Sequence, residues 1–207
     1  MVKEILTGAI LIMMKYRKLL NIALIVIVLL SWGELSFFHS DSFMSAGNFG
    51  SLKYFTILSN LFEAFACAVW LINGNERIKY AASVAVGLTF FTVLFFLGPI
   101  FTYRFMFTGP SFYLHGVVPI AAMLEMIFLC KEKIGRRDNL LSCLSMLVYG
   151  VYYLGNILVN GIGVPPQNND WYGFLRWGWG VGIVILFLMT GAIWLIGFGI
   201  RKLMRNR

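Results

Sequence analysis

Two polar side chains with complementary chemistry stand in separate apolar segments of this sequence. Thr56 lies within KYFTILSN, and His115 lies within SFYLHGVVP. A threonine hydroxyl is a weak nucleophile unless a base removes its proton, and the pKa of histidine suits it to that role. Such a pair could attack an ester carbonyl and form an acyl-enzyme, with Asn60, Asn156 or backbone N–H groups stabilising the oxyanion. Thr56 and His115 are therefore the candidate catalytic residues.

The sequence gives no support to metal or nucleotide chemistry. Its two histidines have no metal-ligand spacing, and Cys67, Cys130 and Cys143 form no CxxC pair. The sequence contains no P-loop, dinucleotide-binding fingerprint or GxSxG elbow. We therefore expect neither a metal ion nor a cofactor.

The composition indicates that these residues stand in a membrane-spanning chain. Of the 207 residues, 59% are hydrophobic and 13% are charged, and the mean hydropathy is +0.80. A soluble domain of this size could not bury so much apolar surface. Apolar runs of about 20 residues, long enough to cross roughly 30 Å of hydrocarbon, recur along the sequence. We predict an all-α fold, a six-transmembrane-helix bundle forming one integral membrane domain over 1–207, with spans near 19–38, 52–72, 79–100, 111–130, 140–160 and 178–200.

The distribution of charge orients the chain. The formal net charge is +8, and most lysines and arginines fall at the two termini and in alternate loops. Only Lys53, Arg104 and Arg176 fall on the other side. The positive-inside rule therefore predicts that both termini are cytoplasmic. Membrane lipids are the expected partners of the basic residues, and no motif indicates a nucleic acid partner.

The second span carries a stripe of polar residues. Lys53, Thr56, Asn60 and Glu63 are spaced by 3, 4 and 3 residues, and Ser59 borders them. On a helix these four positions fall within an arc of roughly 80° and descend roughly 15 Å. A carboxylate facing lipid would be unfavourable, so the stripe must face protein or water.

The predicted topology brings further polar residues to the outer half of the bundle. His115 lies about one turn into the fourth span, at a depth similar to Thr56, and Glu125 lies near the midplane. His39 falls in the first outer loop. The inner half is expected to be mostly apolar, so the site should open to the outer leaflet or to the water outside. The residues expected to bind or orient a substrate are Lys53, Ser59, Asn60, Glu63, Glu34, Asn156, Asn160 and Arg176.

These segments resemble a known family, the androgen-induced and androgen-dependent integral membrane hydrolases and their bacterial relatives. KYFTILSN is similar to the family's segment around its threonine, and HGVVP followed by LEM is similar to its histidine segment. DWYGF resembles an aromatic-proline-aromatic segment, with Gly173 where the family usually has proline. The resemblance implies a bacterial cytoplasmic membrane protein that hydrolyses fatty acid esters of hydroxy fatty acids without a cofactor. It places Thr56 on the nucleophile and His115 on the catalytic histidine.

Two other functions are consistent with the same residues. Glu63 and Glu125, acidic groups near the midplane, would suit a proton-coupled transporter or a non-enzymatic binder of lipids or small molecules. Alternatively, the polar stripe could serve only to hold the helices of a structural subunit together, as serine, threonine and asparagine often do in membranes.

Overall fold

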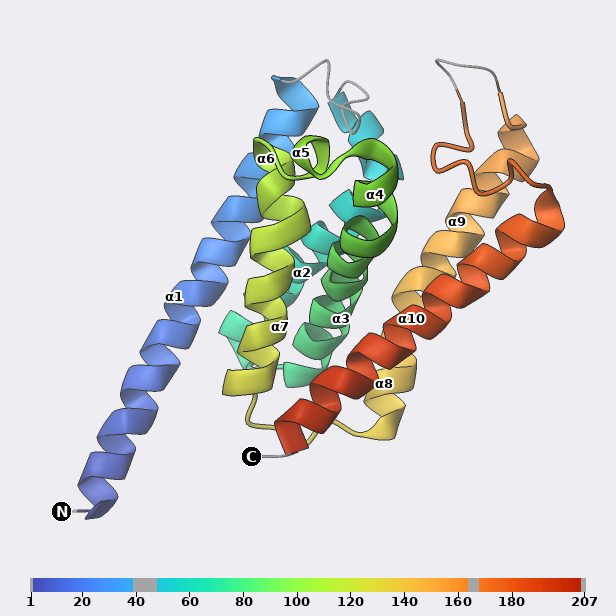
Figure 1. Cartoon of the computed structure of the whole chain (residues 1–207). Helices are drawn as coiled ribbons and strands as arrows, with labels where there is room; N and C mark the ends of the chain where they lie inside the picture. The colour runs from blue at the N-terminus through green and yellow to red at the C-terminus, as the bar shows by residue number, and fades with distance from the viewer. Residues whose placement is uncertain (1, 39–47, 164–167, 206–207) are drawn as a thin grey trace.

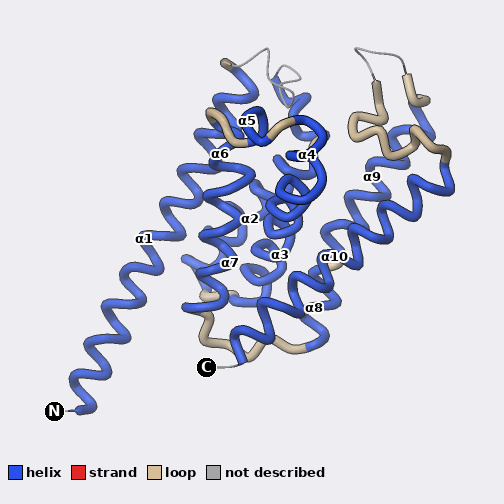
Figure 2. The backbone as a smooth tube through the Cα atoms, viewed as in Figure 1, coloured by secondary structure: helices blue, strands red, loops and turns tan. Residues whose placement is uncertain are grey.

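The computed structural model describes residues 2–38, 48–163 and 168–205, and over these ranges the chain forms helices and connecting loops without a β-strand (Figure 1, Figure 2). His39 lies outside the described residues. Within them, six helices are long and apolar enough to cross a membrane, which confirms the sequence prediction. The protein is therefore an all-helical, multi-pass membrane protein.

The six spans are built from ten of the helical elements. They are α1 (Val2–Phe37); α2 (Phe55–Asn73); α3 (Glu76–Thr92) continued by the π-helical turn η2 (Val93–Leu97); α6 (Pro110–Phe112), the π-helical turn η3 (Tyr113–Val117) and α7 (Val118–Leu129) in succession; α8 (Arg136–Ser142) with α9 (Leu144–Asn160); and α10 (Trp179–Arg205). Shorter connecting elements are η1 (Asn48–Lys53), α4 (Gly98–Phe101) and α5 (Tyr103–Met106).

Local signals in the α2–α3 connection explain why α2 ends at Asn73 and α3 begins at Glu76. Gly74 ends α2 in the left-handed conformation, with φ of 72°, and its N–H donates to the Trp70 carbonyl at 2.8 Å. The Asn75 side chain then accepts from the N–H groups of Arg77 and Ile78 and caps α3. The tight turn holds α2 and α3 side by side, and these two helices carry the buried polar residues Thr56, Asn60, Glu63 and Lys79.

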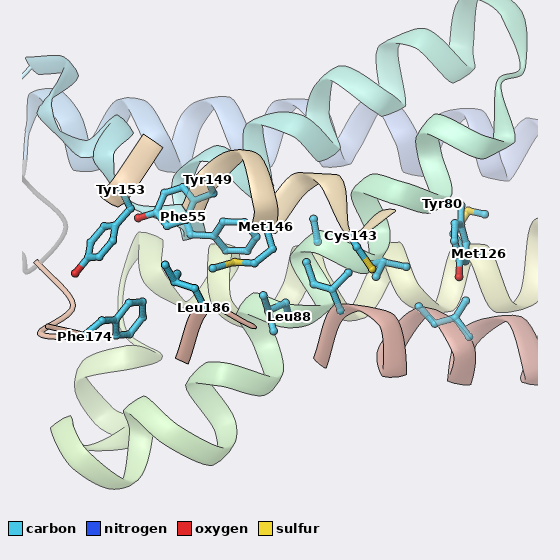
Figure 3. Packing of buried hydrophobic residues seen from close by; sticks show 14 of the residues in the cluster. Phe55, Tyr80, Leu88, Met126, Cys143, Met146, Tyr149, Tyr153, Phe174 and Leu186 are labelled. Atoms are coloured by element: carbon cyan, nitrogen blue, oxygen red, sulfur yellow. The ribbon is translucent and has the colours of Figure 1, made fainter. Parts of the chain in front are cut away.

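The helices fall into two groups, with α1, α2, α3 and α7 in one and α8, α9 and α10 in the other (Figure 1). The beginning of α1 and the end of α10 lie at the same end of the bundle, here called the termini end, and the opposite end is called the far end. Toward the far end, α9 and α10 diverge from the group formed by α1, α2, α3 and α7. Figure 3 shows how buried side chains of both groups join in one core, including Phe55 against Tyr149 near the far end and Tyr80 with Met126 further along.

A close approach of three helices holds the two groups together near the termini end. The Tyr80 hydroxyl of α3 lies 2.6 Å from Asn139 Oδ1 of α8 and 2.8 Å from the Gly197 carbonyl of α10. Asn139 Nδ2 donates to the Trp194 carbonyl at 3.2 Å. A Cβ atom at Gly197 would lie 2.7 Å from the Tyr80 hydroxyl and would also collide with Asn139. Any larger residue at this contact must therefore displace the buried side chains of Asn139 and Tyr80.

We expect Gly197→Ala to destabilise the protein by about 1–3 kcal/mol, because the added methyl group must push α10 away from Tyr80 and Asn139. Gly199→Ala is the matched control, since a Cβ atom there meets nothing within 4 Å. Thermal unfolding in detergent should give a lower melting temperature for Gly197→Ala and an unchanged or higher one for Gly199→Ala. Equal melting temperatures would contradict the close contact.

Candidate functional site

Thr56 lies in the first turn of α2, at the far end, and is 8% exposed. It forms part of the wall of a cavity of about 420 Å³ between α2, α3 and α10, where the two groups of helices diverge. The polar residues of the wall are few, and the rest of the lining is apolar. The cavity is lined by Phe55, Thr56, Leu88, Thr89, Thr92, Val93, Phe96, Leu97, Tyr149, Tyr172, Phe174, Trp177, Val181, Ile185, Leu188, Met189 and Ala192. Such a lining suits an acyl chain, and Thr56 is one of the few residues in it that carry a hydroxyl.

Aromatic residues from α9 and from the loop before α10 hold the beginning of α2 in place. The Phe55 N–H, which has no partner within its own helix, donates to the Tyr172 hydroxyl at 2.8 Å. Tyr149 donates to the Lys53 carbonyl at 2.8 Å and accepts from Trp171 Nε1 at 3.0 Å. Burial raises the pKa of Tyr172, so its phenol stays protonated at neutral pH and remains a hydrogen-bond donor at the cavity.

Tyr149 and Tyr172 are site residues that the sequence prediction missed. The segment DWYGF was identified as a motif, but its tyrosine was given no role. The spacing of residues within one helix places Thr56 and Asn60 on a common face, whereas the contact between Tyr172 and α2 joins positions 117 residues apart. Only the packing of the loop on α2 reveals it.

His115 lies in the π-helical turn η3 and is 3% exposed. Its Nδ1 is 2.8 Å from the Met106 carbonyl. Because a carbonyl only accepts, Nδ1 carries the proton of the neutral ring, and the lone pair of Nε2 is left to act as a base. Met106 lies four residues after Thr102, whose φ of 80° is unusual for a residue other than glycine. Strained backbone and π-helical turns both occur preferentially at functional sites.

Asn60 connects the turn of Thr56 to the turn of His115. Its Nδ2 donates to the Thr56 carbonyl at 2.7 Å and to the Leu114 carbonyl at 3.0 Å. The two candidate catalytic residues are thus next to a shared amide. In the described part of the chain no hydrogen bond joins the Thr56 hydroxyl to the His115 ring, and His115 is not part of the wall of the 420 Å³ cavity.

The other predicted residues of the outer half occupy different surroundings. Ser59 is buried and shares a hydrogen bond of 3.0 Å with the hydroxyl of Thr89. The Lys53 ammonium lies over the rings of Tyr54, at 5.2 Å, and Trp171, at 5.6 Å, and burial lowers its pKa. Four predicted substrate-binding residues are not part of the wall of the Thr56 cavity and are exposed or half-buried: Glu34, Asn156, Asn160 and Arg176. Asn160 donates to Asn156 at 2.9 Å.

The half of the bundle nearer the termini contains a cluster of buried charged side chains, so the prediction that this half is mostly apolar is wrong. All five ionisable members are at most 5% exposed. They come from four helices and include Glu63, which was predicted to act beside Thr56. The cluster consists of Arg17 of α1, Glu63 of α2, Glu76 and Lys79 of α3, and Glu125 of α7.

Arg17 joins three helices through its guanidinium group. It binds Glu76 with two nitrogens, at 2.5 and 2.6 Å, and its Nε donates to Glu125 at 2.9 Å. It also donates to the Leu129 carbonyl at 2.9 Å, and its Cζ lies 4.2 Å from the centre of the Trp70 ring. The flat, fork-shaped guanidinium group can satisfy all these contacts together.

Lys79 joins Glu63 to Glu125, the carboxylate that Arg17 also binds. Its Nζ donates to Glu63, forms an ion pair of 3.2 Å with Glu125 and lies 3.0 Å from the Cys67 sulfur. Ser83 donates to the other Glu63 oxygen at 3.4 Å. Glu63 and Glu125 are thus held by cations rather than facing a substrate.

The cluster contains three carboxyl groups and two cations. Asn21 donates to Glu125 at 2.8 Å, yet its own buried Oδ1 accepts no hydrogen bond among the described residues. The interior of the cluster therefore contains one carboxyl group more than it has cations, and beside it the Asn21 Oδ1 acceptor without a donor among the described residues. A bound proton would balance the charge.

Within the described residues, no group of three histidine, cysteine, aspartate or glutamate side chains is placed to hold a metal ion. The chemistry available at the far end consists of the Thr56 hydroxyl, the His115 ring, the Asn60 amide and the Tyr172 phenol. Comparison of the chain with protein-family models, curated protein sequences and solved structures gave no match.

Proposed function

We propose that this protein is an intramembrane hydrolase of lipid esters, with Thr56 as the nucleophile and His115 as the general base. The observation that carries the proposal is the position of Thr56 in the wall of an apolar cavity, with the Asn60 amide joining the Thr56 carbonyl to the Leu114 carbonyl beside His115. An ester with long acyl chains fits this combination, because the chains occupy the apolar cavity and the carbonyl meets the hydroxyl. Fatty acid esters of hydroxy fatty acids are the proposed substrates, following the family that the sequence resembles.

The reaction proceeds in two steps. Thr56 Oγ1 attacks the ester carbonyl carbon while its proton passes to Nε2 of His115, and the carbonyl oxygen becomes an oxyanion. The His115 proton then passes to the departing alcohol oxygen, which leaves an acyl group on Thr56. A water molecule, deprotonated by His115, then attacks the acyl carbon. The bond between this carbon and Thr56 Oγ1 breaks, His115 returns the proton to Oγ1, and the fatty acid is released.

The environment of Thr56 offers donors for the oxyanion. Thr56 lies in the first turn of α2, where backbone N–H groups lack partners within the helix, and the Tyr172 phenol lines the same cavity. The Met106 carbonyl holds the His115 tautomer that leaves Nε2 unprotonated. The mechanism requires that substrate binding bring His115 Nε2 within hydrogen-bond distance of the Thr56 hydroxyl. Catalytic hydrogen bonds often form fully only in the complex with substrate.

The test is covalent trapping of the nucleophile. We expect a long-chain alkyl fluorophosphonate to modify the purified protein at Thr56, with the adduct located by mass spectrometry of the peptides. Thr92→Ala is the matched control, because Thr92 is a second threonine of the same cavity wall. Labelling should disappear in Thr56→Ala and persist in Thr92→Ala. An adduct on another residue, or equal labelling of Thr56→Ala, would refute the assignment.

The charge imbalance of the buried cluster supports a second candidate function, proton-coupled transport. A surplus carboxyl group in a water-poor interior favours retention of a proton, and release of that proton could be coupled to a substrate. Uptake into vesicles that requires a pH gradient and is lost in Glu63→Gln, with no ester cleavage by the wild-type protein, would favour this candidate over the hydrolase.

A further inference from the structure

A larger cavity, separate from the site of Thr56, opens at the termini end between α8 and α10. Its volume is about 640 Å³. It is lined by Lys133, Ile134, Gly135, Arg136, Asn139, Leu140, Trp194, Phe198, Arg201 and Arg205. We propose that this cavity binds the headgroup of an anionic phospholipid whose acyl chains lie along the outside of α8 and α10.

The charge of the lining is the first support for a negatively charged occupant. Four of the described lining residues, Lys133, Arg136, Arg201 and Arg205, are cationic, and none of the described lining residues is acidic. The acidic side chain closest in sequence to Arg136 on the same helix, Asp138, is already engaged. It accepts from the Gly135 N–H at 2.7 Å and faces Arg77 at 3.7 Å. Four cations around one hollow repel each other unless an anion lies between them.

The apolar part of the lining favours a lipid over a free phosphate. Trp194 and Phe198 of α10 stack with ring centres 5.6 Å apart and an interplanar angle of 13°, and both are about two-fifths exposed. Arg201 lies over the Phe198 ring at 5.7 Å, so the aromatic surface leads directly to the charged end of the cavity. Leu140 of α8 is 60% exposed on the other side. A ligand with a phosphate and hydrocarbon chains matches both parts, whereas inorganic phosphate matches only the cations.

The position of the cavity also suits a headgroup. α10 is a membrane-length helix that ends at Arg205, and Arg201 and Arg205 lie in its last two turns. Basic pockets at the ends of transmembrane helices are where anionic headgroups bind. The two arginines of α10 line the same cavity as Arg136 and Lys133, so the site depends on the packing of α8 against α10 and not on one charged sequence segment.

The experiment compares two variants that lose the same charge from the same helices. Arg136→Gln/Arg201→Gln removes two cations that line the cavity, whereas Arg137→Gln/Lys202→Gln removes their sequence neighbours, which are exposed and do not line it. Full-length protein in detergent is titrated with phosphatidylglycerol or phosphatidylcholine, and bound lipid is counted by native mass spectrometry. Melting temperatures of all variants establish that they fold alike.

We expect phosphatidylglycerol to bind in preference to phosphatidylcholine, and its affinity to fall about thirtyfold in the cavity variant. The neighbour variant should stay within about twofold of the wild-type protein. If the cavity variant fails to fold, Arg205→Gln, which changes one exposed side chain, should give a loss of about fivefold. Equal losses in both double variants, equal binding of the two lipids, or displacement of phosphatidylglycerol by inorganic phosphate at the same concentration would overturn the proposal.

Discussion

Replacing Lys79 by methionine should destabilise the protein by about 3–5 kcal/mol, one of the largest losses available from a single substitution in this chain. Lys79 is the cation that Glu63 and Glu125 share, and all three side chains are fully buried. Methionine fills the space of the alkyl chain, but it leaves Glu63 without its counter-ion and Glu125 with Arg17 alone. The measurement is equilibrium unfolding in mixed detergent micelles, with Lys18→Met, an exposed position of α1, as the control.

A double variant separates the charge from the packing. The single variant Glu63→Gln removes one carboxylate. The double variant Glu63→Gln/Lys79→Met removes both members of the ion pair between Glu63 and Lys79. We expect the double variant to be more stable than Lys79→Met alone, because the uncompensated charge rather than the lost contact causes most of the loss. A Lys79→Met protein within 1 kcal/mol of the wild type would show that the cluster does not hold the helices together.

The sequence was sufficient to predict the spans but not this cluster. Long apolar runs determine where helices cross, and the α2 stripe was correctly expected to avoid lipid, since Thr56, Asn60 and Glu63 are all buried. Arg17 and Lys79, however, were interpreted as charges at the ends of spans. The structure extends the first apolar helical segment back to Leu11, which places Arg17 within the span and against α7.

The reason is that the rotation of each helix about its axis depends on its neighbours. The spacing of Thr56, Asn60 and Glu63 places them on one face of α2, but not opposite a particular partner. In the structure, the same face meets the η3 turn through Asn60 and the Lys79 ammonium through Glu63. The polar stripe of α2 therefore belongs to both the far-end site and the buried charged cluster, whereas the sequence predicted that all of it belongs to one site. Depth along a helix was predictable, and the partner across the helix interface was not.

The second large effect concerns catalysis. We expect His115→Gln to lower the rate of lipid ester hydrolysis by about 10²–10⁴-fold, because the variant lacks a base for the Thr56 proton. Glutamine keeps a similar length and retains a group able to donate to the Met106 carbonyl, so the π-helical turn should remain folded. The turnover of a fatty acid ester of a hydroxy fatty acid by purified protein, measured by mass spectrometry of the released acid, tests this expectation.

The double variant Thr56→Ala/His115→Gln distinguishes a shared chemical step from two structural roles. If the proton of Thr56 passes to His115, removing either residue stops the same step, and the double variant should hydrolyse the ester no more slowly than the slower single variant. If the two side chains instead have independent structural roles, their losses should multiply and should appear equally in the melting temperature. Losses that multiply, with parallel loss of stability, would therefore contradict the threonine–histidine pair even if each single variant were inactive.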